Sequence, residues 1–251
     1  MLRLSAVRFH LVLAALVFAA ALPAAAATDT QSRTVALPPE RALILDISIG
    51  SVRVEGSART DALIEIVRHA PSADALSRLP VDIVEDEQEV RIRALQLEGG
   101  TDAALRSDVT LKVPQAALLR SIRIVEGKLT LRSLTGAITA DVRRGPIDAD
   151  ELSGTVRLET GIGSVTANRT RLSPDGLLRM RAFNGNIVLT LAERPTDARI
   201  LALALNGTIA SDIPLTRKDT WGPRWSQATL GKGEPVISLD VVTGRIEIKV
   251  P

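Results

Sequence analysis

Glycine recurs every nine residues through the middle of this chain, and this spacing constrains the fold more than any other feature. The recurrence fills the stretch GKLTLRSLTGAITADVRRGPIDADELSGTVRLETGIGSVTA, with glycines at Gly127, Gly136, Gly145, Gly154 and Gly163. After each glycine, apolar and polar residues alternate with period two. Period two puts successive side chains on opposite faces of a β-strand, whereas a helix needs apolar spacings of three and four. The repeat therefore predicts short strands joined at glycine corners.

Two positions in each unit are predicted to face a core, namely the second and the fourth after the glycine. Repeats of this size indicate a solenoid, in which two nine-residue units, about 18 residues, form one coil. Coils stack through backbone hydrogen bonds, and a corner glycine allows a sharp turn without a side chain against the neighbouring coils. The predicted inward residues are Leu129, Ile138, Ile147, Val156 and Val165, followed by Leu131, Ala140, Ala149, Leu158 and Ala167.

The glycine unit returns outside the regular stretch with changed spacing. An early copy begins at Gly50, and later copies begin at Gly185, Gly207 and Gly244. These four and the five regular glycines are the predicted structural turn residues. The segment 214–234 is rich in glycine, proline and charge, and we expect it to be an inserted loop.

The strands continue where the strict period is lost, in ALIEIVR, VDIVED, EVRIRAL and DVTLKVP. PSADALSRLP is the one expected helix, with Ser72 as N-cap and Pro80 as its stop, and LEGGTDAALRSD is an expected loop. The predicted fold is all-β, a single elongated β-solenoid domain over residues 28–251. Its expected parts are irregular N-terminal coils and a cap (28–120), regular coils (121–213), the inserted loop (214–234) and the last coil (235–251).

The N-terminus has the pattern of a secretory signal peptide. Arg3 and Arg8 precede an apolar run, and small residues follow around Ala27. The run is shorter than the roughly 20 residues of a spanning helix, and no other long apolar run follows. We expect residues 1–27 to be cleaved and the mature chain to cross the inner membrane without a transmembrane segment. Its destination is then the periplasm, the cell surface or the medium.

Composition excludes several function classes once the signal peptide is removed. Basic and acidic residues become equal in number, and no basic block suggests nucleic acid. The chain has no cysteine, so an exported form has no disulfides. Because only His69 remains, most serine–histidine and multi-histidine metal sites are excluded. We expect His69, at a strand end before Pro71, to be a solvated loop histidine, and we predict no catalytic residue, metal or cofactor.

The order of these segments resembles the adhesin-like β-solenoid family DUF4097, a domain of unknown function. The resemblance lies in ISIGSVRVEG, in DVTLKVP followed by QAALLRSIRIVEGKLTL, in the tandem GPIDADELSGTVRLETGIGSVTA and in the closing GKGEPVISLDVVTGRIEIKV. It implies a β-solenoid and no catalytic residues. This chain departs from the family in holding Arg or Thr outward where an acidic residue often follows the glycine. Its loop with Trp221 and Trp225 has no clear counterpart.

The carboxylates of the repeat have two readings. With two units per coil, Asp148 lies between Thr130 and Thr166, and Asp150 lies between Arg132 and Asn168, which predicts a charge-balanced solvated ladder. The alternative is a polysaccharide lyase or hydrolase, which needs two carboxyl groups about 5 to 9.5 Å apart. Calcium-binding nonapeptide repeats share the period, but GPIDADELS and GAITADVRR lack their second and third glycines. Asp141, Glu151 and Glu159 are the other carboxylates of the repeat that could belong either to a solvated ladder or to a catalytic pair.

Aromatic residues are a second indication of function, because the mature chain has only Phe183, Trp221 and Trp225. We take Trp221, Arg224 and Trp225 as candidate ligand- or partner-binding residues. The alternative is that the tryptophans cover a sheet or cap the end of the coil stack. The leading hypothesis is an exported, non-enzymatic, adhesin-like binding or structural module of the bacterial cell envelope, with an envelope glycan or protein as partner. The alternatives are the polysaccharide enzyme and an assembly subunit that self-associates end to end through its terminal coil.

Overall fold

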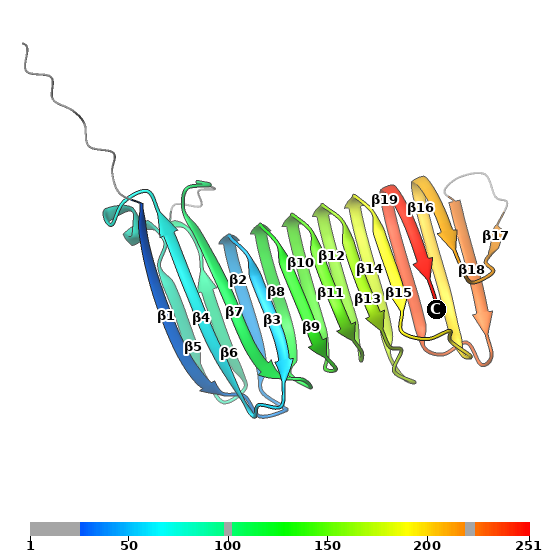
Figure 1. Ribbon diagram of the computed structural model, residues 1–251, viewed down its shortest axis with the longest axis horizontal. Helices are drawn as coiled ribbons and strands as arrows, with labels where there is room; N and C mark the ends of the chain where they lie inside the picture. The colour runs from blue at the N-terminus through cyan, green and yellow to red at the C-terminus, as the bar shows by residue number, and fades with distance from the viewer. Residues whose placement is uncertain (1–25, 98–101, 219–223) are drawn as a thin grey trace, which may run out of the picture.

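The computed structural model describes residues 26–97, 102–218 and 224–251, and within them strands dominate (Figure 1). The described residues contain no α-helix, so the all-β prediction is confirmed. The predicted signal peptide, 1–27, lies almost wholly outside the described residues. The strands are β1 (Ala27–Ala36), β2 (Ala42–Ile49), β3 (Val52–Ser57), β4 (Asp61–Ala70), β5 (Val81–Glu85), β6 (Glu89–Ala94), β7 (Arg106–Pro114), β8 (Leu118–Glu126), β9 (Leu129–Leu134), β10 (Ile138–Arg144), β11 (Ile147–Leu152), β12 (Val156–Ile162), β13 (Val165–Thr170), β14 (Leu177–Asn184), β15 (Ile187–Leu191), β16 (Ala198–Ser211), β17 (Thr216–Lys218), β18 (Arg224–Leu230) and β19 (Val236–Lys249).

Hydrogen bonds join the 19 strands into one mixed sheet. In its middle, the strands pair in parallel with an offset of two nine-residue units, so that Ile138 pairs with Val156 and Ile147 with Val165. One row contains β8, β10, β12 and β14, and the other contains β9, β11, β13 and β15. Figure 1 shows these strands side by side along the long axis. Consecutive units of the repeat therefore alternate between the two rows.

Both rows bury alternate residues in the same hydrophobic cluster. All ten predicted inward residues are buried, among them Ile138, Ile147 and Val156, so this prediction is confirmed. The residues between them, such as Thr139 and Arg157, are exposed. Full burial of one such aliphatic side chain stabilises the fold by about 1.5–3 kcal/mol. The stack is therefore held together mainly by a continuous aliphatic column.

A column of glycines marks one corner of the stack. A Cβ on Gly145 would lie 1.7 Å from the carbonyl oxygen of Gly127, and a Cβ on Gly127 would lie 1.7 Å from that of Gly50. Gly127 and Gly145 also have φ of +149° and +138°. Of the nine predicted turn glycines, Gly136 and Gly207 have no positive φ, but a Cβ on either would also overlap a carbonyl oxygen. Close approach of the backbones is thus the shared requirement.

The opposite corner contains left-handed residues that are not glycine. Ser133, Glu151 and Arg169 have φ of 53°, 55° and 48°, a region that side chains seldom adopt. The Ser133 hydroxyl donates to Glu151 Oε2 at 2.9 Å, and Arg169 Nε lies 3.3 Å from Glu151 Oε1. This hydrogen bond and the Arg169 charge lower the pKa of Glu151 below its ordinary value. The glycine pattern did not predict these left-handed residues.

The order of strands along the stack departs from the order in the chain. Residues 235–251, expected as the last coil, do not lie at its end. β19 pairs with β14 and β15 on one side and with β16 on the other. Likewise, β2 lies between β6 and β8, and β3 lies between β7 and β9. Main-chain hydrogen bonds do not distinguish one strand from another, so the repeat pattern leaves this order open.

The expectation of a loop over 214–234 is wrong for much of that segment. It contains β17 and β18, and β18 pairs antiparallel with β16 from Ala198–Leu230 to Ala204–Arg224. The alternation in RWSQATL explains the strand, because Ala228 and Leu230 pack against the core cluster. This hairpin covers one edge of β16, which would otherwise be open.

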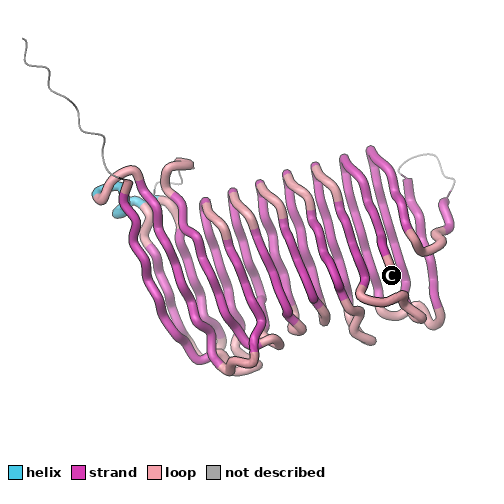
Figure 2. The backbone as a smooth tube through the Cα atoms, viewed as in Figure 1, coloured by secondary structure: helices cyan, strands magenta, loops and turns pink. Residues whose placement is uncertain are grey.

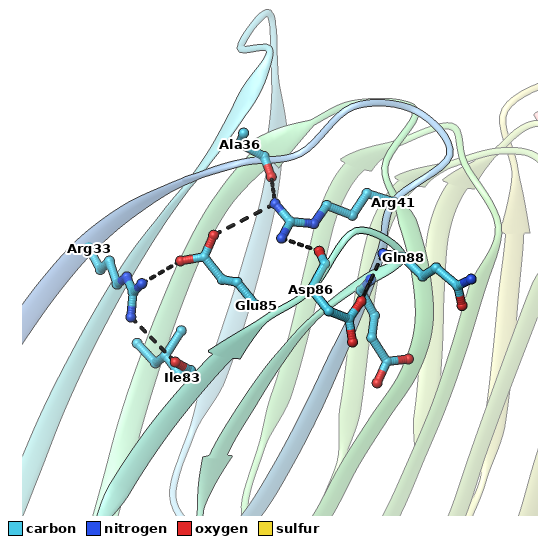
Figure 3. A network of polar contacts seen from close by, with 8 residues as sticks. Arg33, Ala36, Arg41, Ile83, Glu85, Asp86 and Gln88 are labelled. Carbon is cyan, nitrogen blue, oxygen red and sulfur yellow. Dashed lines mark hydrogen bonds and ion pairs between the residues drawn. The ribbon is translucent and has the colours of Figure 1, made fainter.

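The N-terminal part contains antiparallel strand pairs. It also contains the contacts of Arg41 with the main chain at Ala36 and Asp86, which we call the Arg41 clamp. β1 pairs with β4, and β5 pairs with β6. In Figure 3, Arg33 of β1 bonds to Glu85 of β5, and Arg41 donates to the carbonyl oxygens of Ala36 and Asp86. These contacts connect β1 to β5 and to the segment that precedes β2.

The expected helix after β4 is a short 3₁₀ helix, η1 (Asp74–Arg78), drawn in cyan in Figure 2. The N-cap is Ala73 and not the predicted Ser72, although the Ser72 hydroxyl accepts from the Ala75 N–H at 3.3 Å. The expected loop LEGGTDAALRSD is shorter than predicted, because β7 begins at Arg106. In the described ranges, no helix has the length and hydropathy of a membrane span.

Candidate functional site

Trp225 lies on the outer surface of the sheet and not in the core. It is in β18, where it pairs with Leu203 of β16 and with Lys218 of β17. Its side chain is 38% exposed, and Lys218 Nζ lies 5.7 Å from the centre of its ring. A cation at this distance over an indole is a cation–π contact. Trp225 is therefore available to a partner and already held in place.

The structure does not describe how the side chains of the other two predicted binding residues lie relative to Trp225. Trp221 lies outside the described residues. Arg224 pairs through its main chain with Ala204, and its side chain is outside the description. Of the three, the structure places the side chain of Trp225 alone.

A row of apolar side chains on neighbouring strands continues outward from the same sheet. Ala182 of β14 and Ala204 of β16 both pair with Val241 of β19, and all three are buried. Because side chains alternate, the next residue on each strand faces outward. Those residues are Phe183, Val242 and Leu205; Phe183 is 61% exposed and Leu205 47% exposed.

We call these residues, together with the half-buried Leu203, the outer apolar face. Its members are Phe183, Leu203, Leu205, Trp225 and Val242. They lie on β14, β19, β16 and β18, which Figure 1 shows next to one another toward one end of the stack. On β10 and β12 of the same row, the outward residues Thr139, Asp141, Arg157 and Glu159 are polar, and the exposed apolar residue there is Ile162 at the end of β12. Grouped exposed apolar residues on an otherwise polar surface mark a binding site more often than scattered ones do.

Charged residues border the outer apolar face. A shallow groove of about 330 Å³ is lined by Leu203, Leu205 and Val242 together with Arg179, Arg181 and Asp240. Arg179 lies 3.9 Å from Asp240, and Arg181 lies 3.7 Å from Glu159. Exposed ion pairs at such distances contribute little stability, so both guanidinium groups remain available to a ligand.

The sequence reasoning missed Phe183, Leu203, Leu205 and Val242. A signal was present in ILALALN, now part of β16, where the residues on both faces of the strand are apolar. That pattern is unusual for a strand with one solvated face. The register that aligns these residues came only from the structure.

The carboxylate ladder has the predicted register and is occupied by ion pairs. Asp148 pairs with Thr130 and Thr166, and Asp150 pairs with Arg132 and Asn168. Lys128 Nζ lies 2.5 Å from Asp148 Oδ2, and Arg169 Nη2 lies 2.5 Å from Asp150 Oδ2. Each carboxylate thus has a basic partner from a neighbouring unit.

His69 lies at the end of β4, as expected, but it is not a solvated loop residue, because its ring contacts a carboxylate. His69 Nε2 lies 3.1 Å from Asp108 Oδ2, while the Ser51 hydroxyl and main-chain N–H donate to Asp108 Oδ1 at 2.7 and 2.9 Å. A nucleophile–base pair would need the hydroxyl on the imidazole. Here Asp108 lies between Ser51 and His69, so the arrangement joins strands and does not activate Ser51.

The ionisation of Asp108 is set by these contacts. Burial by itself would raise the pKa of Asp108, but the Ser51 hydrogen bonds and the charges of Arg106 and His69 outweigh it and lower that pKa.

Across the described parts of the chain, no group of three or more His, Cys, Asp or Glu side chains is arranged to hold a metal ion.

Comparison with known proteins gives structural likeness alone. No protein-family model and no curated protein matches the sequence. A "putative cell adhesion protein" from Clostridium sporogenes is 15% identical with a TM-score of 0.48, covering 89% of this chain and 100% of its own. A "putative adhesin" from Bacteroides fragilis is 14% identical with a TM-score of 0.38, covering 90% and 97%. A "putative lipid binding protein" from Parabacteroides distasonis is 9% identical with a TM-score of 0.37, covering 88% and 96%.

Similarities at this level assign no function to the chain. The resemblance to DUF4097 stays a prediction, because no family model matches.

Proposed function

We propose that this protein is an exported, non-enzymatic β-solenoid that serves as an adhesin-like binding module of the bacterial cell envelope. Two features support the solenoid. Strands pair in parallel at an offset of two repeat units, and the corner glycines stack through direct backbone contact. Coils built this way expose a long, regular surface on which a partner can be held.

The outer apolar face is the observation that carries the binding role. It combines Phe183, Leu205 and Trp225 with the nearby Arg179 and Arg181. Aromatic residues and arginine are enriched in protein–protein interfaces, and aliphatic side chains bind sugar hydroxyls poorly. The proposed occupant of this face is therefore an envelope protein, and a glycan is the less favoured alternative.

The ion pairs of the carboxylate ladder support a non-enzymatic role. A glycosidase needs one carboxylic acid that keeps its proton and one free carboxylate. Asp148 and Asp150 instead form ion pairs with Lys128 and Arg169, so neither is a free carboxylate.

Export rests on the N-terminal sequence. Arg3 and Arg8, the apolar run after them and the small residues up to Ala27 form the predicted signal peptide. Mass spectrometry of the protein recovered from periplasm and medium tests this. We expect an N-terminus at Thr28, and an intact Met1 in the cytoplasm would contradict it.

A binding screen tests the proposed function. Purified mature protein is measured by interferometry against envelope proteins and envelope glycans, beside the variant Leu205→Ser/Trp225→Ala. We expect an envelope protein to bind wild type and to lose at least tenfold in affinity for the variant, with little change in thermal midpoint.

The control is Thr139→Ala/Arg157→Ala, which changes outward residues of the same row away from the outer apolar face. It should bind like wild type. Equal binding by the Leu205/Trp225 variant would overturn the assignment of the face. Turnover of an envelope polysaccharide or peptide by the purified protein would overturn the non-enzymatic role.

A further inference from the structure

Three connections that break the nine-residue period meet in one pocket away from the outer apolar face. They are residues 171–176 between β13 and β14, 192–197 between β15 and β16, and 231–235 between β18 and β19. The pocket has a volume of about 490 Å³. Sites for small molecules typically have volumes of about 300–1,000 Å³.

Hydrogen bonds hold these connections together without a ligand. Asp197 Oδ1 accepts from the Lys232 N–H at 2.8 Å, and the Arg199 N–H donates to the Pro235 oxygen at 2.9 Å. The pocket is therefore preformed, and a ligand need not order its walls before binding.

One of the residues that line the pocket has a buried hydroxyl without a partner in the described structure. Thr170 lines the pocket and is only 2% exposed, and its Oγ1 makes no hydrogen bond with a described residue. Leu191 and Pro235 beside it are buried and apolar. A buried polar group without a partner is costly, so most native structures satisfy it.

An irregularity in the strand accompanies this hydroxyl. The pairing of β13 with β15 shifts between Ala167 and Thr170, so that Thr170 pairs with Leu191. Bulges of this kind re-aim side chains and are common next to binding sites.

Charged groups of both signs form the rim. Asp175, Glu193 and Glu234 supply carboxylates, while Arg194 and Lys232 supply cations. Within the described structure, none of these five side chains forms an ion pair or hydrogen bond with another residue, in contrast to the paired carboxylates of the ladder. Carboxylates only accept hydrogen bonds, and ammonium and guanidinium groups only donate them.

This combination selects a chemical class of ligand. Each hydroxyl of a sugar both donates and accepts, so a rim that offers both acceptors and donors matches sugar hydroxyls. An apolar floor suits the C–H face of a sugar ring. Four carboxylates against two cations around the pocket, counting Asp197, disfavour phosphates and acidic sugars.

We propose that the pocket between residues 171–176, 192–197 and 231–235 is a binding site for a neutral saccharide of one or two residues, with the Thr170 hydroxyl as its buried polar contact. This site is separate from the outer apolar face and does not depend on the function proposed for that face.

Titration of the full chain with neutral saccharides tests the proposal. The probes are glucose, maltose, cellobiose and N,N′-diacetylchitobiose, with galacturonic acid and inorganic phosphate as anionic comparisons, followed by calorimetry or ligand-observed NMR. We expect at least one neutral probe to bind with a dissociation constant below about 1 mM and both anions to bind at least tenfold more weakly.

The variant Thr170→Val keeps the shape of the side chain and removes the hydroxyl. We expect it to lose at least tenfold in affinity for the neutral probe, with a thermal midpoint equal to or above that of wild type. A lower midpoint would show that the hydroxyl already serves a structural bond and would overturn its assignment to a ligand.

Glu193→Gln/Glu234→Gln should also weaken saccharide binding, because amides accept more weakly than carboxylates. Leu205→Ser/Trp225→Ala should leave it unchanged, which separates this site from the outer apolar face. Absence of binding by all four neutral probes, or unchanged affinity in Thr170→Val, would overturn the proposal.

Discussion

Gly207 lies directly against the carbonyl oxygen of Gly244, although 37 residues separate the two in the chain. A Cβ on Gly207 would lie 1.7 Å from that oxygen, and the contact joins β16 to β19. Since Gly207 has no positive φ, the requirement for glycine here is one of space. The same contact recurs between Gly244 and Gly185.

Gly207→Ala should destabilise the protein, because the added methyl group forces two main chains apart. Overpacking of this kind costs about 1–3 kcal/mol, measured as the change in free energy of unfolding in urea. The control is Thr208→Ala, an exposed neighbour on the same strand, which should change stability by no more than about 0.5 kcal/mol. Equal stability of Gly207→Ala and wild type would contradict the backbone contact.

Ile147 and Asp148 are neighbours on β11 with opposite surroundings, the first fully buried and the second exposed in an ion pair with Lys128. Ile147→Ala should cost about 2–5 kcal/mol, because it removes buried methyl groups and leaves a cavity. Asp148→Asn should cost at most about 1 kcal/mol, as expected of an exposed ion pair. Thermal unfolding of the two variants checks this, and a reversed ranking would mean that β11 faces the other way.

Acid should destabilise the protein in part through Asp108. Its folded pKa lies below its ordinary value, so its contribution is present above about pH 4 and is lost as the pH falls through the folded pKa. Ser51→Ala removes one of the hydrogen bonds that lower this pKa. We therefore expect a smaller loss of unfolding free energy between pH 6 and pH 3 in Ser51→Ala than in wild type.

Urea unfolding at the two pH values measures this difference. Ser32→Ala, an exposed serine of β1, is the control and should follow the wild-type pH dependence. If Ser51→Ala also followed it, the Ser51–Asp108 hydrogen bond would not contribute to acid sensitivity.

The Arg41 clamp should govern the stability of the N-terminal strands. Its side chain is only 12% exposed, and it donates to the Ala36 oxygen at 2.8 Å and to the Asp86 oxygen (Figure 3). Arg41→Lys keeps the charge but cannot form both bonds with one planar group. We expect a loss of about 1–3 kcal/mol and faster amide hydrogen exchange in β1 and β5 than in β11 and β12.

Arg33→Ala is the comparison for that experiment, because its side chain is 50% exposed. It should cost no more than about 1 kcal/mol. Uniform exchange changes throughout the chain in Arg41→Lys would argue against a local clamp.

The sequence pattern predicted the structure well where burial and strand pairing follow from the repeat itself. Ile138 and Val156 are buried, and Asp148 faces Thr130 and Thr166, because alternation and an 18-residue offset fix both the face and the neighbour. The pattern failed in segment 214–234, where glycine and proline suggested a loop but the alternation around Trp225 made β18. At the second corner the glycines Gly136 and Gly154 were predicted, but the left-handed residues before them had no signal, because serine, glutamate and arginine share no preference for a positive φ.

The candidate sites were also predicted only in part from the sequence. Trp225 was predicted from its rarity, whereas Phe183 and Val242 join it only because β14, β19, β16 and β18 are neighbours in space. Thr170 is an ordinary polar residue in the sequence, and its buried hydroxyl becomes notable only when three distant connections meet around it.

The sequence by itself determined which residues form strands, which side of each strand is buried and where the chain needs glycine. These depend on side-chain alternation and on the space beside one backbone atom. Only the tertiary structure decided that β19 lies between β15 and β16, and hence which surface residues meet. The reason is that main-chain hydrogen bonds are the same for every strand, so the lengths of the connections and the fit of distant side chains determine which strands are neighbours.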